Sequence, residues 1–113
     1  MKRIFLILTF SSLLLGSSCT FEKAEPMSTE CLAPVSYSTD IDTIISFKCG
    51  GCHGPGSSDG DLTDYAVLKT KIESGVFKTR VFITKDMPQG GPALPEDELS
   101  KIKCWMEQGA LNN

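Results

Sequence analysis

The sequence predicts an all-α domain behind an N-terminal export signal. Apolar residues recur at helical spacing in three stretches, around residues 41–52, 63–74 and 96–108. The segments between these stretches are rich in glycine and proline, which are typical of loops. The chain has 113 residues, which is too short for two full domains. We therefore expect one small helical domain.

Residues 1–18 have the pattern of an export signal: the cations Lys2 and Arg3, a short apolar run and then small residues. The apolar run is shorter than the ~20 residues that cross a membrane as a helix. Small residues directly before Cys19 resemble a bacterial lipoprotein signal, although Gly16 replaces the usual leucine. The resemblance implies an exported protein whose acylated Cys19 holds it on a periplasm-facing or cell-surface membrane. A plain secretory signal is the alternative.

The rest of the chain divides into a tether and a domain. Residues 19–36 are polar and contain two prolines, so we expect a lipidated cysteine followed by a flexible tether. Residues 37–113 form the domain. Loss of residues 1–18 removes two of the 11 basic residues and none of the 14 acidic ones, so the net charge changes from -3 to -5. An acidic surface discourages anionic partners such as nucleic acid and steers a positively charged one.

The expected helices have local start and stop signals. The first begins at the capping oxygens of Ser38–Asp40 and runs toward Cys49. The second begins near residue 63 and stops at Gly75, whereas residues 76–83 fit either a strand or a short helix.

Residues 85–95 are a loop by composition, with three prolines and two glycines. The last helix begins near Pro95, carries acidic residues 96–98 at its positive end and stops at Gly109. The residues expected in the core are Ile41, Ile45, Leu68, Leu99 and Trp105, with Tyr37, Phe47, Tyr65, Phe77 and Phe82 as further candidates.

The segment Cys49-Gly50-Gly51-Cys52-His53 is a C-x-x-C-H motif, the attachment signature of c-type haem. Residues three apart on a helical turn share a face, so both thiols can form thioether bonds to one porphyrin. His53, the single histidine of the chain, would then bind the iron. Export agrees, because c-type haem is attached outside the cytoplasm. The motif predicts one haem c per chain.

Other interpretations of this motif stay open. A thioredoxin-like redox pair begins a helix after a strand, whereas this motif ends a helix. A zinc site would need Cys31 and Cys104 as further thiolates, which an oxidising compartment disfavours. A chance coincidence of two cysteines and a histidine is the third possibility.

The chain resembles the class I cytochrome c family, and specifically small bacterial c-type domains. The resemblance covers about residues 37–113. The matching residues are Cys49–His53, Met87-Pro88 with Gly90-Gly91-Pro92, Trp105, Gly109-Ala110 and Asn112-Asn113.

The resemblance implies a bundle of about three main helices around one covalently bound haem. His53 would be the proximal ligand of the iron and Met87 the distal one. The position of Met87 agrees, because it is the only methionine in a Pro/Gly loop, while Met27 lies in the tether and Met106 in the last helix. The alternative is that Met87 packs on apolar surface and leaves the iron open.

The resemblance has two further implications. A nearby proline carbonyl often holds the second nitrogen of the proximal histidine, and Pro55 is the closest candidate. The first and last helices of this fold meet, so a disulfide between Cys31 and Cys104 would tie the chain start to that contact. Two separate buried thiols are the alternative.

The expected function is single-electron transfer between extracytoplasmic redox partner proteins, by a carrier tethered to a membrane through lipid. No acid–base set for catalysis is apparent, so we expect a carrier and not an enzyme. The alternatives are a haem enzyme or gas sensor with an open distal site, and a structural zinc protein.

Overall fold

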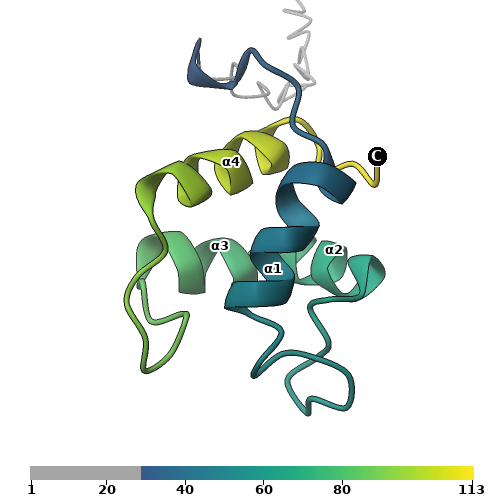
Figure 1. Ribbon diagram of the computed structural model, residues 1–113, viewed down its shortest axis with the longest axis vertical. Helices are drawn as coiled ribbons and strands as arrows, with labels where there is room; N and C mark the ends of the chain where they lie inside the picture. Colours follow the sequence, from purple (N-terminus) through teal and green to yellow (C-terminus); the bar gives the residue numbers. More distant parts are fainter. Residues whose placement is uncertain (1–28) are drawn as a thin grey trace, which may run out of the picture.

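The computed structural model describes residues 29–113 (Figure 1), so the expected export signal, Cys19 and Met27 lie outside the described residues. Residues 29–113 are helical and contain no strand, so this part of the chain is all-α, as predicted. None of its helices is both long and apolar enough to cross a membrane. The elements are η1 (Thr29–Cys31), η2 (Tyr37–Ile41), α1 (Asp42–Lys48), α2 (Tyr65–Glu73), α3 (Val76–Lys78), η3 (Thr79–Ile83) and α4 (Glu96–Glu107).

The first helical segment starts earlier than the sequence predicts. The π-helical turn η2 begins at Tyr37, after the N-cap residue Ser36, and leads directly into α1. The predicted cap at Ser38–Asp40 is therefore wrong. Asp40 lies inside the first turns, and its carboxylate accepts a hydrogen bond from the Ser36 N–H at 3.0 Å. Asn113 accepts from the Tyr37 N–H at 2.8 Å, so a residue far along the chain helps to cap the first helix.

The second helical segment follows its local signals. Asp64 is the N-cap of α2, and its carboxylate accepts from the N–H groups of Ala66 and Val67. Gly75 adopts a φ of 78° between α2 and α3, a conformation that favours glycine. Residues 76–83 are helical (α3 and η3), which settles the question that the sequence left open. Their buried residues Phe77 and Val81 are four apart and so share a face.

The last helix, α4, confirms the predicted start near Pro95. After it, the chain folds back on the helix at Gly109, where φ is 98°. The Ala110 N–H donates to the Trp105 carbonyl at 2.8 Å, and the Trp105 indole donates to the Leu111 carbonyl at 2.9 Å. Tyr65 donates its hydroxyl to the Ala110 carbonyl at 2.8 Å, which fixes the tail against α2.

The hydrophobic core lies where η2, α1, α2, α3 and α4 meet. Tyr37 stacks on Trp105 with ring centroids 5.6 Å apart and meets Tyr65 edge-on at 5.1 Å. Phe47, an expected core residue, is 83% exposed, so that prediction is wrong. It lies in the last turn of α1, after the buried Ile44 and Ile45. The buried core residues are Tyr37, Ile41, Ile44, Ile45, Leu62, Leu68, Phe77, Val81, Leu94, Ile102, Trp105 and Ala110.

The segment before η2 is fastened to α4. Cys31 and Cys104 form a disulfide with Cα atoms 4.9 Å apart, and Cys31 is buried. Gln108 donates to the carbonyls of Cys31 and Ala33 and accepts from the Val35 N–H. The folded unit thus includes residues ahead of Tyr37.

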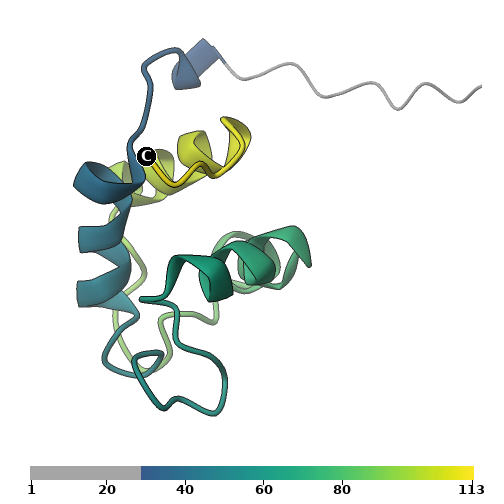
Figure 2. The ribbon, with the colours of Figure 1, turned by 90° about the vertical axis from the view of Figure 1, so that its right-hand side faces the viewer.

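Two long loops and η1 lie at opposite ends of the molecule. The loops over residues 49–64 and 84–95 extend toward one end, and η1 lies at the opposite end (Figure 1). A view turned by 90° shows the same separation (Figure 2). The segments that contain the predicted haem-binding residues Cys49, Cys52, His53 and Met87 therefore extend toward the end opposite η1 (Figures 1 and 2).

Candidate functional site

The C-x-x-C-H motif forms the turn that follows α1. Cys49 is the C-cap of this helix, and its N–H donates to the Ile45 carbonyl. The Cys49 carbonyl in turn accepts from the Cys52 N–H at 3.1 Å and from the His53 N–H at 2.7 Å. These backbone bonds place the two cysteines and the histidine on one tight turn.

Two glycines make this turn possible. A Cβ atom on Gly50 would lie 2.5 Å from the Ser46 carbonyl oxygen, and one on Gly54 would lie 2.5 Å from the Gly50 carbonyl oxygen. Backbone atoms cannot move aside as a flexible side chain can. A Cβ on Gly51, by contrast, meets nothing within 4 Å. The packing therefore requires glycine at positions 50 and 54 but not at 51.

The two thiols of the motif are free and differ in environment. Cys52 is exposed and Cys49 is partly buried. Burial, followed by the negative charge of Glu98, raises the pKa of the Cys49 thiol to about 11. This thiol stays protonated at neutral pH, whereas a redox-active thiol needs a lowered pKa. The environment of Cys49 thus disfavours a thioredoxin-like pair.

The backbone of His53 is hydrogen-bonded, whereas a nitrogen of its ring is not. Its backbone carbonyl accepts from the Leu62 N–H at 2.7 Å, which closes the loop that follows the motif. Its ring nitrogen Nδ1 is buried and has no hydrogen-bond partner in residues 29–113. The expected bond to the Pro55 carbonyl is therefore wrong. A buried polar atom without a partner costs about 1–3 kcal/mol, so the described chain alone does not satisfy this imidazole.

Met87 lies in a loop whose first residues are anchored. The N–H groups of Asp86 and Met87 donate to the Arg80 carbonyl, and the Arg80 guanidinium pairs with Asp86 at 2.8 Å. The Thr84 hydroxyl donates to Asp86, and this bond, with the Arg80 contacts, lowers the pKa of that carboxyl. Met87 is partly buried and packs against the same hydrophobic core as Cys49.

Glu98 lies beside the Cys49–His53 turn, although its position in the sequence does not indicate it. Its carboxylate is 3.6 Å from the Lys48 ammonium, and one of its oxygens, Oε2, is buried without a hydrogen-bond partner in the described chain. It also acts electrostatically on Cys49. The sequence shows only an acidic residue in the first turn of a helix. Nothing local signals that this turn lies against the end of α1.

The zinc interpretation is contradicted by the disulfide, because Cys31 and Cys104 are not available as thiolates. Among residues 29–113, no three His, Cys, Asp or Glu side chains form a group that could hold a metal ion. What remains near the motif is one imidazole and two thiols, with the Met87 thioether in the neighbouring loop. This set lacks the four ligands of a structural zinc site.

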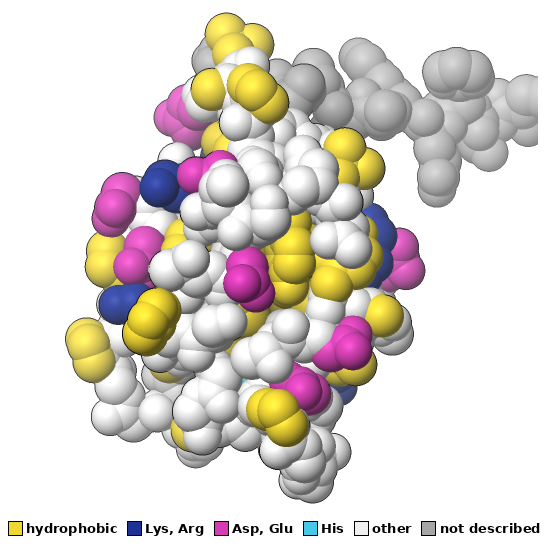
Figure 3. All heavy atoms as spheres, turned by 45° about the vertical axis from the view of Figure 1, so that its right-hand side comes forward, with side chains coloured by type: hydrophobic (Ala, Val, Ile, Leu, Met, Phe, Trp, Pro, Cys, Tyr) yellow, Lys and Arg dark blue, Asp and Glu magenta, His cyan; other side chains and the backbone are white. Residues whose placement is uncertain are grey.

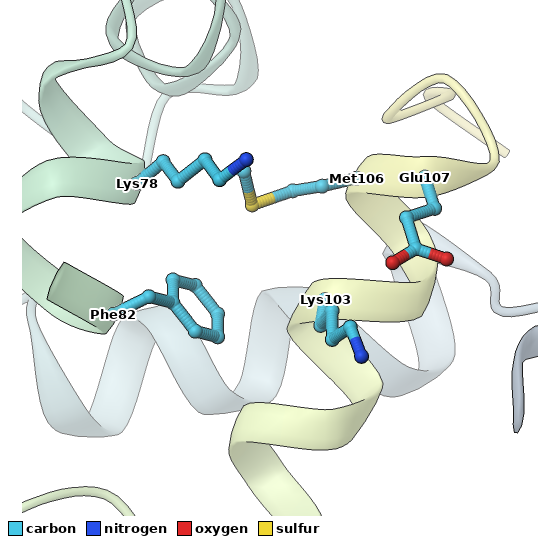
Figure 4. Close-up of a pocket in the computed structure, with 5 residues that line it drawn as sticks. All are labelled: Lys78, Phe82, Lys103, Met106 and Glu107. Atoms are coloured by element: carbon cyan, nitrogen blue, oxygen red, sulfur yellow. The ribbon is translucent and has the colours of Figure 1, made fainter. Parts of the chain in front are cut away.

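A separate hollow of about 360 Å³ lies between the α3–η3 segment and α4 (Figure 4). None of the predicted site residues lines it. Its lining residues are Lys78, Phe82, Lys103, Met106 and Glu107.

Comparison with known proteins gives no relative: the chain matches no protein-family model, no curated protein and no solved structure.

Proposed function

We propose that the chain is a monohaem c-type cytochrome that carries single electrons between extracytoplasmic redox partners. The observation that carries this proposal is the turn after α1, which contains two free thiols and the only histidine of the chain, and where the Cys49 carbonyl accepts from the Cys52 and His53 N–H groups. The proposal includes a cytochrome c-like bundle of about three main helices around one haem.

The residues present fit a covalently bound haem. Cys49 and Cys52 are the two free thiols of residues 29–113, because Cys31 and Cys104 are already paired with each other. Each thiol would add across one vinyl group, with sulfur bonding to one carbon and hydrogen to the other, so no oxidant is consumed. No acceptor in residues 29–113 holds the buried Nδ1 of His53, so the ring would be free to take the orientation of the proximal ligand. The chemistry that haem iron supplies is reversible one-electron transfer.

Met87 is the proposed distal ligand. A thioether is a soft ligand that favours Fe(II), so histidine–methionine ligation raises the reduction potential relative to two histidines. The anchored start of its loop limits the motion of Met87. Electron transfer benefits from such rigidity, because coordination that hardly changes between oxidation states keeps reorganisation small.

The disulfide supports an extracytoplasmic location, since disulfides persist in oxidising compartments. We propose that residues 1–18 are removed on export and that lipid on Cys19 holds the protein at a membrane. The fixed end of the tether is then Cys31, which is bonded to α4. No nucleic acid is involved in this function.

The test is an absorption spectrum of protein produced with haem-maturation machinery, before and after reduction. We expect a reduced low-spin c-type spectrum and, by mass spectrometry, one haem on the Cys49–Cys52 peptide. Met87→Ala should convert the spectrum to high-spin, whereas Met106→Ala, at another partly buried methionine, should not. A colourless product defeats the haem assignment. Ready binding of carbon monoxide by the reduced protein favours the sensor or enzyme alternative.

A further inference from the structure

The charges of the described chain are divided unevenly between its parts. Residues 49–64 and 86–98, which we call the acidic end, contain seven acidic residues; the lysines Lys48 and Lys85 directly precede the two segments, which themselves contain no lysine or arginine. The rest of residues 29–113 contains eight basic and five acidic residues. The acidic residues of this end are Asp59, Asp61, Asp64, Asp86, Glu96, Asp97 and Glu98.

The two segments of the acidic end lie together. Both contain a loop that extends to the end of the molecule opposite η1 (Figures 1 and 2). The 3.6 Å contact between Glu98 and Lys48 brings the first turn of α4 against the end of α1, next to Cys49. One segment contains the C-x-x-C-H turn and the other contains Met87. The acidic end is therefore the end that holds the proposed redox site.

Some carboxylates of the acidic end are exposed and are therefore available to a binding partner. Four of the seven carboxylates are engaged within the fold: by Thr63, by the start of α2, by Arg80 and by Lys48. Asp59, Glu96 and Asp97 are exposed and form no ion pair within residues 29–113. Toward this end of the molecule, acidic side chains lie beside exposed hydrophobic ones (Figure 3).

An exposed aromatic residue adjoins the same end. Phe47 is in the last turn of α1, two residues before Cys49, and 83% of it is exposed. Aromatic side chains are enriched at the centres of protein interfaces, with charged residues around them. Ile83, directly before the Met87 loop, is also largely exposed.

We propose that the acidic end, with Phe47 as its apolar contact, is the docking surface for a redox protein whose contact face is basic. This inference rests on the proposed function, because it assumes that electrons leave and enter at the Cys49–His53 turn. Opposite charges raise the encounter rate and orient the partners, so that the two redox centres approach closely. A second copy of this chain would present a face of like charge, which opposes self-association there.

The first test uses the purified haem-loaded protein and two small oxidants of opposite charge. Tris(1,10-phenanthroline)cobalt(III) is cationic and aromatic, and ferricyanide is anionic. We expect added salt to slow oxidation of the reduced protein by the cobalt complex and to speed oxidation by ferricyanide. Asp59→Lys combined with Glu96→Lys should lower the cobalt rate by roughly threefold to tenfold at low salt.

The matched control separates local charge from net charge. Glu73→Lys combined with Glu107→Lys changes the net charge equally but lies outside the acidic end. The proposal expects a clearly smaller effect from this pair, and an equal effect would overturn it. Phe47→Ala should slow the cobalt reaction, whereas Leu32→Ala, at a residue 79% exposed near η1, should not.

A second readout does not depend on haem. A lysine-rich peptide titrated into ¹⁵N-labelled protein should shift amide signals of residues 49–64 and 86–98, and the shifts should vanish at high salt. Shifts confined to other residues would contradict the docking surface. Dimerisation that Phe47→Ala abolishes would assign the surface to a second copy and also overturn the proposal. If the protein carries no haem, its colourless spectrum defeats the proposed function separately, while the peptide still reports on the surface.

Discussion

Glu98 in the first turn of α4 lies 3.6 Å from Lys48 at the end of α1, and the same carboxylate acts on the Cys49 thiol. Both side chains of the ion pair keep part of their surface in solvent, so the pair itself contributes little to stability. Its significance is positional. It marks where the beginning of the last helix lies against the end of α1, next to the turn that contains the two thiols.

The raised pKa of Cys49 predicts a pH-dependent stability in protein produced without haem. The folded thiol ionises near pH 11, whereas the thiol of the unfolded chain ionises near its ordinary value of 9. Between these values the unfolded state has lost a proton that the folded state retains. The free energy of unfolding is therefore constant for this group below pH 9 and falls as the pH rises toward 11. The loss is about 2–3 kcal/mol in total.

Urea unfolding at several pH values measures this effect, with Cys49→Ala as the variant that removes it. Tyr37 also has a raised pKa, chiefly from burial, and contributes in the same direction at higher pH. The comparison with Cys49→Ala isolates the thiol. Thioether formation consumes the thiol, so the haem-loaded protein should lack the Cys49 contribution. An identical pH dependence in Cys49→Ala would show that another group is responsible.

The disulfide between Cys31 and Cys104 should be a major source of stability. It closes a loop with a sequence separation of 73, for which the chain-entropy relation gives about 4 kcal/mol. We expect the double variant Cys31→Ser/Cys104→Ser to lose roughly this free energy in urea unfolding. The c-type spectrum that the proposed function predicts should persist at low temperature, because neither residue belongs to the Cys49–His53 turn.

Gln108 should also help to attach the segment before η2 to the end of α4. Its side chain forms three hydrogen bonds with the segment from Cys31 to Val35. Gln108→Ala removes the side-chain partner of three backbone groups, two of them partly buried, so we expect a loss of about 1–3 kcal/mol. Gln89→Ala, at an exposed glutamine in the Met87 loop, is the matched control. Equal thermal stability of both variants would mean that the segment is held by the disulfide alone.

Asn113 should act as a remote cap of the first helix. Its side-chain oxygen accepts from the Tyr37 N–H at 2.8 Å, and its backbone oxygen accepts from the Ser38 N–H at 2.9 Å. Asn113→Ala removes the side-chain acceptor and should cost about 0.5–2 kcal/mol, the usual range for a lost cap. Asn112→Ala, one residue earlier and exposed, should cost less. Thermal unfolding followed by circular dichroism compares the two.

The first and second helices show what the sequence could predict. Asp64 and Gly75 bound the second helix through their own side chain or conformation, so their signals are local and the prediction was right. The first helix begins at Tyr37 because Asn113, 76 positions away, accepts its N–H. No local pattern contains that partner, and the predicted start was therefore several residues late.

In the candidate site, too, residues close in sequence could be predicted, whereas residues brought together by packing could not. The residues from Cys49 to His53 are contiguous, so their spacing alone placed them on one turn. Glu98 reaches that turn only because α4 packs against α1, and it was missed. Phe47 was expected in the core from its hydrophobicity, but its position on α1 turns it to solvent. Hydrophobicity alone cannot distinguish a core residue from an exposed contact residue.

The glycines of the Cys49–His53 turn allow a sharp test of its geometry. Gly50→Ala would place a Cβ 2.5 Å from the Ser46 carbonyl oxygen and 3.2 Å from the Thr63 methyl group, so the turn or the end of α1 must shift. We expect a loss of about 1–3 kcal/mol, the usual cost of overpacking, and poorer haem attachment. Gly51→Ala adds the same atom where nothing lies within 4 Å, so stability and haem content should both be retained.

The comparison of these two variants separates backbone geometry from sequence preference within the motif. Both keep the two cysteines and the histidine, and both add one methyl group between them. Thermal unfolding of protein without haem measures the packing cost, and the haem absorbance per protein measures attachment. If Gly50→Ala matched Gly51→Ala in both measurements, the close approach of Gly50 to Ser46 would not be required. The turn after α1 would then be adaptable, and the arrangement of Cys49, Cys52 and His53 would depend on the bound haem more than on the helix that precedes it.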